Sequence, residues 1–238
     1  MKNLTLFNKN TISSNCSSCV IGHICAASGL DNIEELDKLI NKRIQVKKKE
    51  ELIKKQQQVV YGIRYGSFKI QIDNKQPTKK IVEFCLPGEI IGLDDLISEK
   101  SNSSAIALEN SELCIIEIKN LDRLSKQMPL LQLQFRGIMS KEIIKFHSLL
   151  SIVNIINSKK RIIAFLLDLS RKYEQLGYSS TNFILRMSRE EIGNFLGLTL
   201  ETVSRLLKQL MKENLIIVRN RNIILKDKEL LYKYLKNE

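Results

Sequence analysis

The sequence predicts an α+β protein with an N-terminal antiparallel β-roll, a long central helix and a C-terminal winged helix-turn-helix. Three observations predict this fold class. Short β-type runs broken by turn residues fill about residues 43–118, a long apolar periodicity follows, and the last third reads as helices followed by a hairpin. The expected organisation is a cysteine-rich segment over 1–30, the roll over 31–129, the long helix over 130–157 and the winged helix-turn-helix over 158–238.

The roll is predicted from strands of regular spacing. A short amphipathic helix over Asp31–Ile40 precedes it. The clearest strand pattern covers Val59–Ile72, where we expect Gly62 and Gly66 to mark bends. The other expected elements are a turn at Asp73–Pro77 and strands at Ile81–Leu86, Ser104–Leu108 and Leu113–Ile118. Several short strands at this spacing indicate an antiparallel barrel or roll.

A brief helix over Leu121–Met128 is interrupted by Pro129, and a long helix is expected from about Leu130 to Asn157. Its apolar residues step by 4, 3, 4 and 3 positions, which is a heptad seam. The seam consists of Met139, Ile143, Phe146, Leu150 and Val153, with the polar Asn157 at its end. A second stripe contains Ile138, Leu149, Ile152 and Ile156. We expect one stripe to pack on the roll and the other on a second copy of the chain, with a single buried helix as the alternative.

The helix-turn-helix is predicted from its capping and turn residues. Ser188 with Glu191 three positions later forms a capping box, and Gly197 ends that helix. Gly193 supplies a small contact between helices, and Thr199 caps the next helix, which runs to about Lys212. An amphipathic helix over Arg161–Tyr173 comes before, and two short strands over Leu215–Leu225 around an Arg219–Asn222 turn come after.

The second helix of the motif presents side chains suited to duplex DNA. Arginine can bond guanine O6 and N7, glutamate can accept from cytosine N4, and hydroxyl groups reach bases or phosphates. The expected DNA-binding residues are Glu201, Thr202, Ser204, Arg205 and Lys208. Glu201 and Arg205 could equally form an i,i+4 surface ion pair.

Charge agrees with a polyanionic partner. The chain carries a net charge of +12, and residues 158–238 hold 16 Lys and Arg against 9 Asp and Glu. A basic segment of this kind is typical of nucleic-acid binding, although a solvated basic surface would look the same.

Composition narrows the compartment and the class of protein. The start of the chain lacks the apolar core of a signal peptide, and no apolar run approaches the roughly 20 residues that span a bilayer. We therefore expect a cytoplasmic protein without membrane contact, whose five cysteines stay reduced. Two histidines and no nucleophile paired with a base make an enzyme unexpected.

Four cysteines form a candidate metal or iron–sulfur site. Cys16, Cys19 and Cys25 lie close together in sequence, and Cys114 must come from a distant strand. Four thiolates suit a [4Fe–4S] cluster, a [2Fe–2S] cluster or tetrahedral zinc, and spacing alone leaves these open. A thiol–disulfide enzyme using Cys16 and Cys19 is a further alternative, but it lacks the βαβ context of such enzymes. Cys85, between Phe84 and Leu86, is expected to be buried.

The chain resembles the CRP/FNR transcription regulators, and within them the oxygen-sensing FNR proteins, over nearly its whole length. Besides the cysteines, the resemblance rests on four segments: Tyr61-Gly-Ile-Arg-Tyr-Gly-Ser-Phe-Lys69, Leu86-Pro-Gly-Glu-Ile-Ile-Gly-Leu-Asp-Asp95, Ala107-Leu-Glu-Asn-Ser-Glu-Leu-Cys114 and Arg189–Arg205. It implies a roll of the cyclic-nucleotide-binding type. It also implies a [4Fe–4S] cluster on Cys16, Cys19, Cys25 and Cys114, a homodimer joined through the long helix, and RNA polymerase as a partner.

The same resemblance implies base reading by Glu201, Ser204 and Arg205 at palindromic sites similar to TTGAT-N4-ATCAA. Cyclic-AMP-binding relatives carry a glutamate and an Arg-Ser pair where this chain has Leu93 and Ser103-Ser104, so we expect no cyclic nucleotide. The sequence thus predicts an oxygen-responsive transcription regulator. A constitutive or zinc-stabilised regulator and a thiol–disulfide enzyme are the alternatives.

Overall fold

A computed structural model describes residues 42–52, 59–73, 79–95, 103–127 and 129–236 of the chain. The chain divides into two compact units, 1–141 and 142–238, and the division falls within helix α3 (Pro129–Val153). The expected helix over Asp31–Ile40, the segment 74–78 and three of the four candidate cysteine ligands lie outside the described residues. No described helix combines the length and apolar character that crossing a membrane would require.

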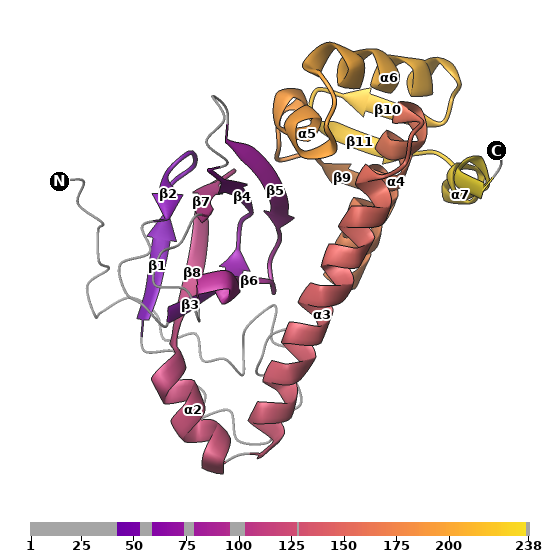
Figure 1. The fold of residues 1–238 in the computed structure, drawn as a ribbon. Coiled ribbons are helices and arrows are strands. Elements are labelled where there is room, and N and C mark those ends of the chain that lie inside the picture. The colour runs from indigo at the N-terminus through magenta and orange to yellow at the C-terminus, as the bar shows by residue number, and fades with distance from the viewer. Residues whose placement is uncertain (1–41, 53–58, 74–78, 96–102, 128, 237–238) are drawn as a thin grey trace. The chain divides into compact units, whose positions relative to one another are not determined.

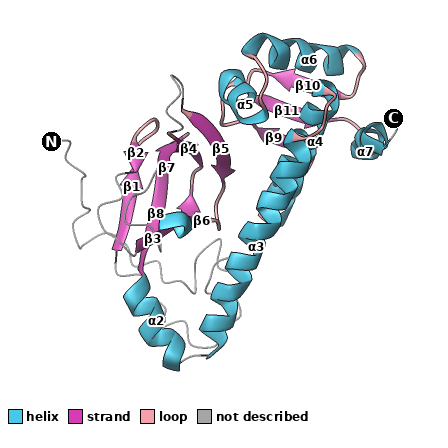
Figure 2. Ribbon diagram, viewed as in Figure 1, coloured by secondary structure: helices cyan, strands magenta, loops and turns pink. Residues whose placement is uncertain are grey.

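The first unit is an antiparallel β-roll, as the sequence predicts (Figures 1 and 2). Its described strands form two four-stranded sheets, of order β1-β8-β3-β6 and β2-β7-β4-β5. The strands are β1 (Lys42–Val46), β2 (Glu51–Leu52), β3 (Val59–Tyr65), β4 (Phe68–Ile72), β5 (Lys80–Cys85), β6 (Ile90–Ile91), β7 (Ser103–Ala107) and β8 (Ser111–Glu117). The core between the sheets is built on fully buried side chains such as Ile63, Phe68 and Leu113.

The two glycines of the Val59–Ile72 segment have different roles. Gly66 has φ +92° and makes the turn between β3 and β4, as expected, because this conformation strains residues with a Cβ atom. The expectation that Gly62 marks a bend is wrong. Gly62 lies inside β3 and pairs with Cys114 of β8 and Ile90 of β6, while the strand's irregularity falls between Ile63 and Tyr65.

A second apolar cluster covers the outer face of the β1-β8-β3-β6 sheet. Val60 and Ile116 of the sheet pack with Leu121 of α2 (Ile118–Gln127) and Leu131 of α3, all of them buried. Phe135 of α3 packs against the same cluster. The beginning of α3 is therefore held on the sheet that carries Cys114.

Helix α3 begins at Pro129 and ends earlier than the sequence suggests. Proline suits the first helical position, because the N–H that it lacks would have no intrahelical partner there. The expected continuation to Asn157 is wrong, since α3 stops at Val153. Asn157 instead caps helix α4 (Ser158–Gln175), and its side chain accepts from the N–H groups of Lys159 and Lys160. An asparagine at the end of an apolar periodicity thus marks a new helix start, rather than the last position of the seam.

The second unit holds the expected winged helix-turn-helix with two further elements. Its elements after α4 are β9 (Asn182–Ile184), α5 (Arg189–Leu196), α6 (Leu200–Lys212), β10 (Ile216–Arg219), β11 (Asn222–Leu225) and α7 (Lys228–Lys236). β9 joins the predicted hairpin in a three-stranded sheet of order β10-β11-β9. β9 and α7 were not predicted, because a three-residue strand and a short helix carry little periodicity.

Candidate functional site

Helices α5 and α6 are joined as the local sequence dictates. The Ser188 hydroxyl accepts from the N–H of Glu191 at 3.1 Å, and the Glu191 carboxylate accepts from the N–H of Ser188 at 2.6 Å, which completes the capping box. Gly197 ends α5 with φ +68°, and the Thr199 hydroxyl caps α6 by accepting from the N–H of Thr202. These capping predictions are confirmed.

Gly193 of α5 lies against the backbone of the turn that joins α5 to α6. A Cβ atom at this position would lie 2.6 Å from the Leu198 carbonyl oxygen, which belongs to the backbone of the turn. The Gly193 carbonyl also accepts from the N–H of Leu198 at 2.8 Å. The expected need for a small residue is therefore confirmed.

Helix α6 has one buried and one exposed face. Val203, Leu206, Leu207 and Leu210 are buried, so the helix is anchored in the core of the second unit. Of the expected DNA-binding residues, Glu201, Arg205 and Lys208 are exposed, whereas Thr202 and Ser204 are half-buried. The geometry leaves a charged surface free to meet a polyanion.

Two of these side chains already have partners. Ser204 accepts a hydrogen bond from the Arg189 guanidinium at 3.4 Å, which brings a cation from the start of α5 beside α6. The pKa of Glu201 is lowered, because its carboxylate accepts from its own backbone N–H and then from the Thr199 hydroxyl. Glu201 is therefore negatively charged at neutral pH. It lies in the first half of α6, which also holds Arg205.

The β10–β11 wing carries two further cations, at the turn predicted over Arg219–Asn222. Arg219 and Arg221 are exposed at its tip, and Asn220 between them has φ +57°. The Arg221 guanidinium donates to the Arg186 carbonyl at 3.0 Å. The alternation of arginine and asparagine could have pointed to a phosphate-binding wing, since both residue types contact DNA backbones.

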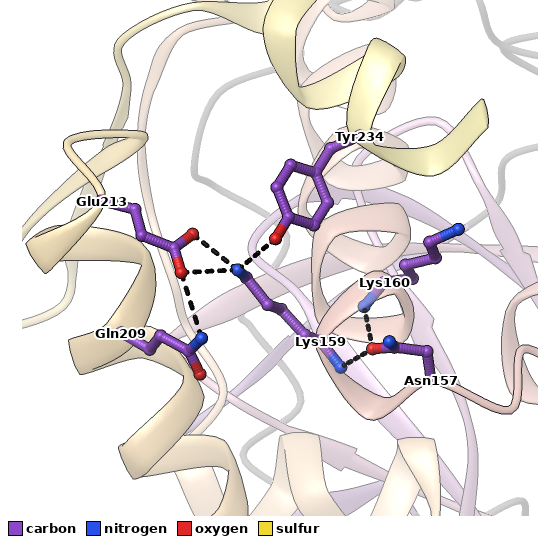
Figure 3. A network of polar contacts seen from close by, with 6 residues as sticks. All are labelled: Asn157, Lys159, Lys160, Gln209, Glu213 and Tyr234. Atoms are coloured by element: carbon purple, nitrogen blue, oxygen red, sulfur yellow. Dashed lines mark hydrogen bonds and ion pairs between the residues drawn. The ribbon is translucent and has the colours of Figure 1, made fainter. Parts of the chain in front are cut away.

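A polar network ties the first turn of α4 to the end of α6 and to α7 (Figure 3). The Lys159 ammonium donates to both carboxylate oxygens of Glu213 and to the Tyr234 hydroxyl, each at 2.6 Å, and Gln209 donates to Glu213 at 3.0 Å. Burial acts to lower the pKa of Lys159, but the hydrogen bonds to Glu213 and Tyr234 outweigh burial and raise it. The bond from Lys159 lowers the pKa of Glu213.

Cys114 lies on the outer face of the β1-β8-β3-β6 sheet. It is half-buried and pairs with Arg43 of β1 and Gly62 of β3. Because side chains alternate along a strand, Cys114 faces the same side as Ile116, two residues on, which packs against α3. Cys16, Cys19 and Cys25 lie outside the described residues.

Cys85 lies in the core between the sheets, and only 1% of it is exposed, in agreement with its expected burial. Its thiol donates to Glu83 at 3.2 Å, and Glu89 accepts from the N–H of Leu86 at 2.6 Å. Glu83, Cys85 and Glu89 offer ligand atoms within 4.8 Å of one another, but both carboxylates are engaged in these hydrogen bonds.

The seam of α3 is open to solvent in the single chain. Met139, Ile143, Phe146 and Leu150 are 39%, 58%, 57% and 52% exposed, and Val153 is half-buried. In the second stripe, Ile138 packs against the roll, and Ile156 lies beyond the end of the helix. The roll therefore takes the beginning of α3, and the predicted seam is left uncovered.

Both parts of the chain match known protein domains. Residues 160–234 match the Crp-like helix-turn-helix domain, and residues 43–128 match the cyclic nucleotide-binding domain. The transcriptional regulatory protein btr of Bordetella pertussis is 49% identical over 216 residues, covering 89% of each chain. The chain belongs to the CRP/FNR family of transcription regulators.

Other CRP/FNR proteins extend this similarity. The fumarate and nitrate reduction regulatory protein of Vibrio cholerae is 35% identical over 221 residues, covering 91% of this chain and 88% of that one. The structure of FixK2 from Bradyrhizobium japonicum shares the fold, with a TM-score of 0.70 at 23% identity over 81% of this chain and 96% of that one. A transcription regulator of this family binds DNA through its helix-turn-helix.

Proposed function

We propose that this regulator responds to oxygen through a [4Fe–4S] cluster held by Cys16, Cys19, Cys25 and Cys114. The cluster would favour a cytoplasmic homodimer that binds palindromic sites similar to TTGAT-N4-ATCAA when oxygen is absent. The proposal rests chiefly on the place of Cys114, on the sheet face that also packs the start of α3. Relatives named as fumarate and nitrate reduction regulators support it.

The surroundings of Cys114 fit a bulky group. Among the described residues, a Cβ atom at Gly62 would make ordinary van der Waals contact with the Cβ atom of Cys114 at 3.9 Å and with the Cδ1 atom of Ile116 at 4.0 Å, so the glycine leaves this volume beside Cys114 unfilled by β3. Four cysteine thiolates are a suitable donor set for an iron–sulfur cluster. When bound, the cluster would supply an oxygen-labile link between residues 1–30 and β8.

The signal would pass from Cys114 to α3 through packed side chains. Ile116 and Leu131 of α3 belong to the same group of packed apolar side chains. A shift of β8 near Cys114 would therefore change the packing that holds the dimerisation helix on the sheet. Two states of the chain are required, and binding at the cysteines must favour the dimer by a few kcal/mol to switch its population. The exposed seam, from Met139 to Val153, would then be buried against the second copy.

In the dimer, each α6 would enter a major groove, with the two half-sites about one helical turn or 34 Å apart. Arg205, Glu201 and Ser204 would read base edges, and Thr202 and Lys208 would reach bases or phosphates. RNA polymerase would be the protein partner at promoters.

We propose that no cyclic nucleotide binds in the roll. Leu93 packs against the outer apolar cluster, and the Ser103 hydroxyl donates to Asp94 at 2.6 Å, so these positions offer a phosphate no cation. Addition of cyclic AMP should leave DNA affinity unchanged.

The test is anaerobic purification, followed by visible absorption and by iron, sulfide and zinc analysis before and after exposure to air. We expect about four irons and four sulfides per chain, with colour that air bleaches. Cys114→Ser should lose the cluster, whereas the matched Cys85→Ser should keep it, because Cys85 is buried in the core.

The outcome that contradicts the proposal is one zinc per chain without colour, together with DNA binding that oxygen does not change. That result would support a zinc-stabilised regulator. Equal cluster content in Cys114→Ser and Cys85→Ser would show that Cys114 is not a ligand.

A further inference from the structure

The connector between α3 and α4, residues 154–157, is bonded to the helix-turn-helix by one side chain. Arg161, in the first turn of α4, donates from Nε and Nη2 to the Ile155 carbonyl at 2.9 Å and 2.6 Å. Its Nη1 donates to the Leu196 carbonyl at 2.8 Å. A single half-buried guanidinium therefore spans the connector and the end of α5.

The chemistry of both acceptors suits arginine. Leu196 is the last residue of α5, and carbonyls at a helix C-terminus lack intrahelical partners and carry the negative end of the helix dipole. The planar guanidinium donates in several fixed directions at once, which the single ammonium of lysine does not. Gly197, whose Cβ atom would lie 3.8 Å from Nη1 of Arg161, leaves room for the guanidinium beside the turn.

The contact between Arg161 and Leu196 lies close to the start of α6, the recognition helix that would read DNA. Leu196 precedes Thr199, the cap of α6, by three residues, so the contact fixes the connector close to the start of the recognition helix. Lys159, two residues before Arg161, is bonded to Glu213 just after α6. The first turn of α4 thus contacts the residues that flank α6 on both sides.

All of these groups lie in the second unit, which also contains the C-terminal half of α3. The three bonds from Arg161 join the residues that leave α3 to the residues that enter α6. Bending between the dimerisation helix and the DNA-binding part therefore has to occur before Ile155 or break these bonds.

We infer that Arg161 is a positioning residue that sets the separation of the two recognition helices in the dimer, and so the spacing of half-sites. The inference rests on the proposed dimeric recognition of a palindrome. One base pair added to the spacer moves a half-site by about 3.4 Å and turns it by about 35°. A recognition helix that is bonded firmly to the connector should not move to reach the displaced half-site, whereas a loosely bonded recognition helix should.

The test compares Arg161→Met, Arg161→Lys and the control Arg171→Met. Arg171 lies on the same helix and is exposed, and within the described part of the chain it forms a local ion pair with Asp168 at 2.7 Å. Anaerobically purified, cluster-loaded protein is titrated by fluorescence anisotropy with duplexes whose identical half-sites are separated by 3, 4, 5 or 6 base pairs. A duplex with one half-site measures the recognition helix by itself.

We expect wild-type protein and Arg171→Met to prefer one spacer by about tenfold or more, the usual cost of one poor base-pair contact. Arg161→Met should narrow this preference to about threefold or less, while its affinity for the single half-site changes by less than about twofold. Arg161→Lys should fall between them, and it takes over the test if the methionine variant does not fold.

An unchanged spacer preference in a folded Arg161 variant would overturn this inference alone. Equal loss of affinity for every duplex, including the single half-site, would also overturn it, because that pattern indicates a merely structural role. Wild-type protein without any spacer preference would overturn both the inference and the proposed recognition of a palindrome.

Discussion

Replacing Gly193 by alanine should destabilise the second unit, although alanine is the better helix former. The added Cβ atom would lie 2.6 Å from the Leu198 carbonyl oxygen, and backbone atoms cannot rotate away as a side chain can. Helix α5 and the turn would have to separate by several tenths of an ångström, which strains the 2.8 Å bond from the Leu198 N–H to the Gly193 carbonyl.

The magnitude follows from three contributions. Overpacking costs about 1–3 kcal/mol and the weakened hydrogen bond about 1 kcal/mol, while helix propensity returns about 1 kcal/mol. The net loss is about 1–3 kcal/mol, which lowers the melting temperature of a unit of this size by roughly 10 °C.

Gly137 provides a matched control. It lies exposed inside α3, and its added Cβ atom would meet no neighbouring atom of the described residues within 4 Å, so Gly137→Ala should stabilise α3 by up to about 1 kcal/mol. Thermal unfolding followed by circular dichroism measures both variants, and hydrogen exchange localises the effect of Gly193→Ala to α5 and α6. A melting temperature of Gly193→Ala at or above that of wild type would refute the reasoning.

The remaining predictions concern the seam, the polar network and base reading. Phe146→Asp should weaken dimerisation of the cluster-loaded protein by about 3 kcal/mol or more, whereas Ile144→Asp, equally exposed but outside the seam, should change it little, as measured by sedimentation. Glu213→Gln should destabilise the second unit by about 0.5–1 kcal/mol at neutral pH, because the pair with Lys159 lies near the surface. The pKa of Glu213 is lowered in the folded state, so its contribution to stability is present above the unfolded pKa of about 4.3 and is lost as pH falls through the folded pKa. The pKa of Lys159 is raised, so its contribution to stability is lost only as pH rises above about 10.4. In urea unfolding, a wild-type advantage over Glu213→Gln that does not decrease as pH is lowered from neutral into the acidic range would contradict this account. Arg205→Ala should lose about 1–3 kcal/mol on a cognate duplex and nothing on scrambled DNA in the same anisotropy titration, because its guanidinium would read a base rather than a phosphate. An equal loss on both duplexes would instead make it a phosphate contact.

The helix-turn-helix shows what local sequence can predict. The capping box of Ser188, the left-handed Gly197 and the Thr199 cap are each confirmed within a few residues of their expected partners. Hydroxyl caps and left-handed glycines act over three or four residues, so no distant part of the chain is needed to form them. The fold class follows from the same kind of local pattern, repeated along the chain.

The end of α3 shows where local pattern was insufficient. Apolar periodicity continues past Val153 to Ile156, so it predicts a helix that reaches Asn157. In the structure the Ile155 carbonyl is bound by Arg161, and Asn157 caps α4. Apolar periodicity indicates which residues avoid water. It does not indicate which backbone carbonyl accepts a hydrogen bond from a side chain six residues away.

The sequence by itself determined the roll, the long helix and the winged helix-turn-helix, and it predicted four of the five cysteines as candidate ligands. Strand alternation, helix caps and turn glycines are properties of neighbouring residues. Only the tertiary structure decided that Gly62 lies beside Cys114, that Arg189 reaches Ser204, and that Arg161 joins the connector to the turn before α6. These contacts join residues that lie between 6 and 52 positions apart in the chain, and a contact of that kind exists only after sheets and helices have packed. The residues that would read DNA could therefore be predicted from the sequence, but the side chains that hold them in place could not.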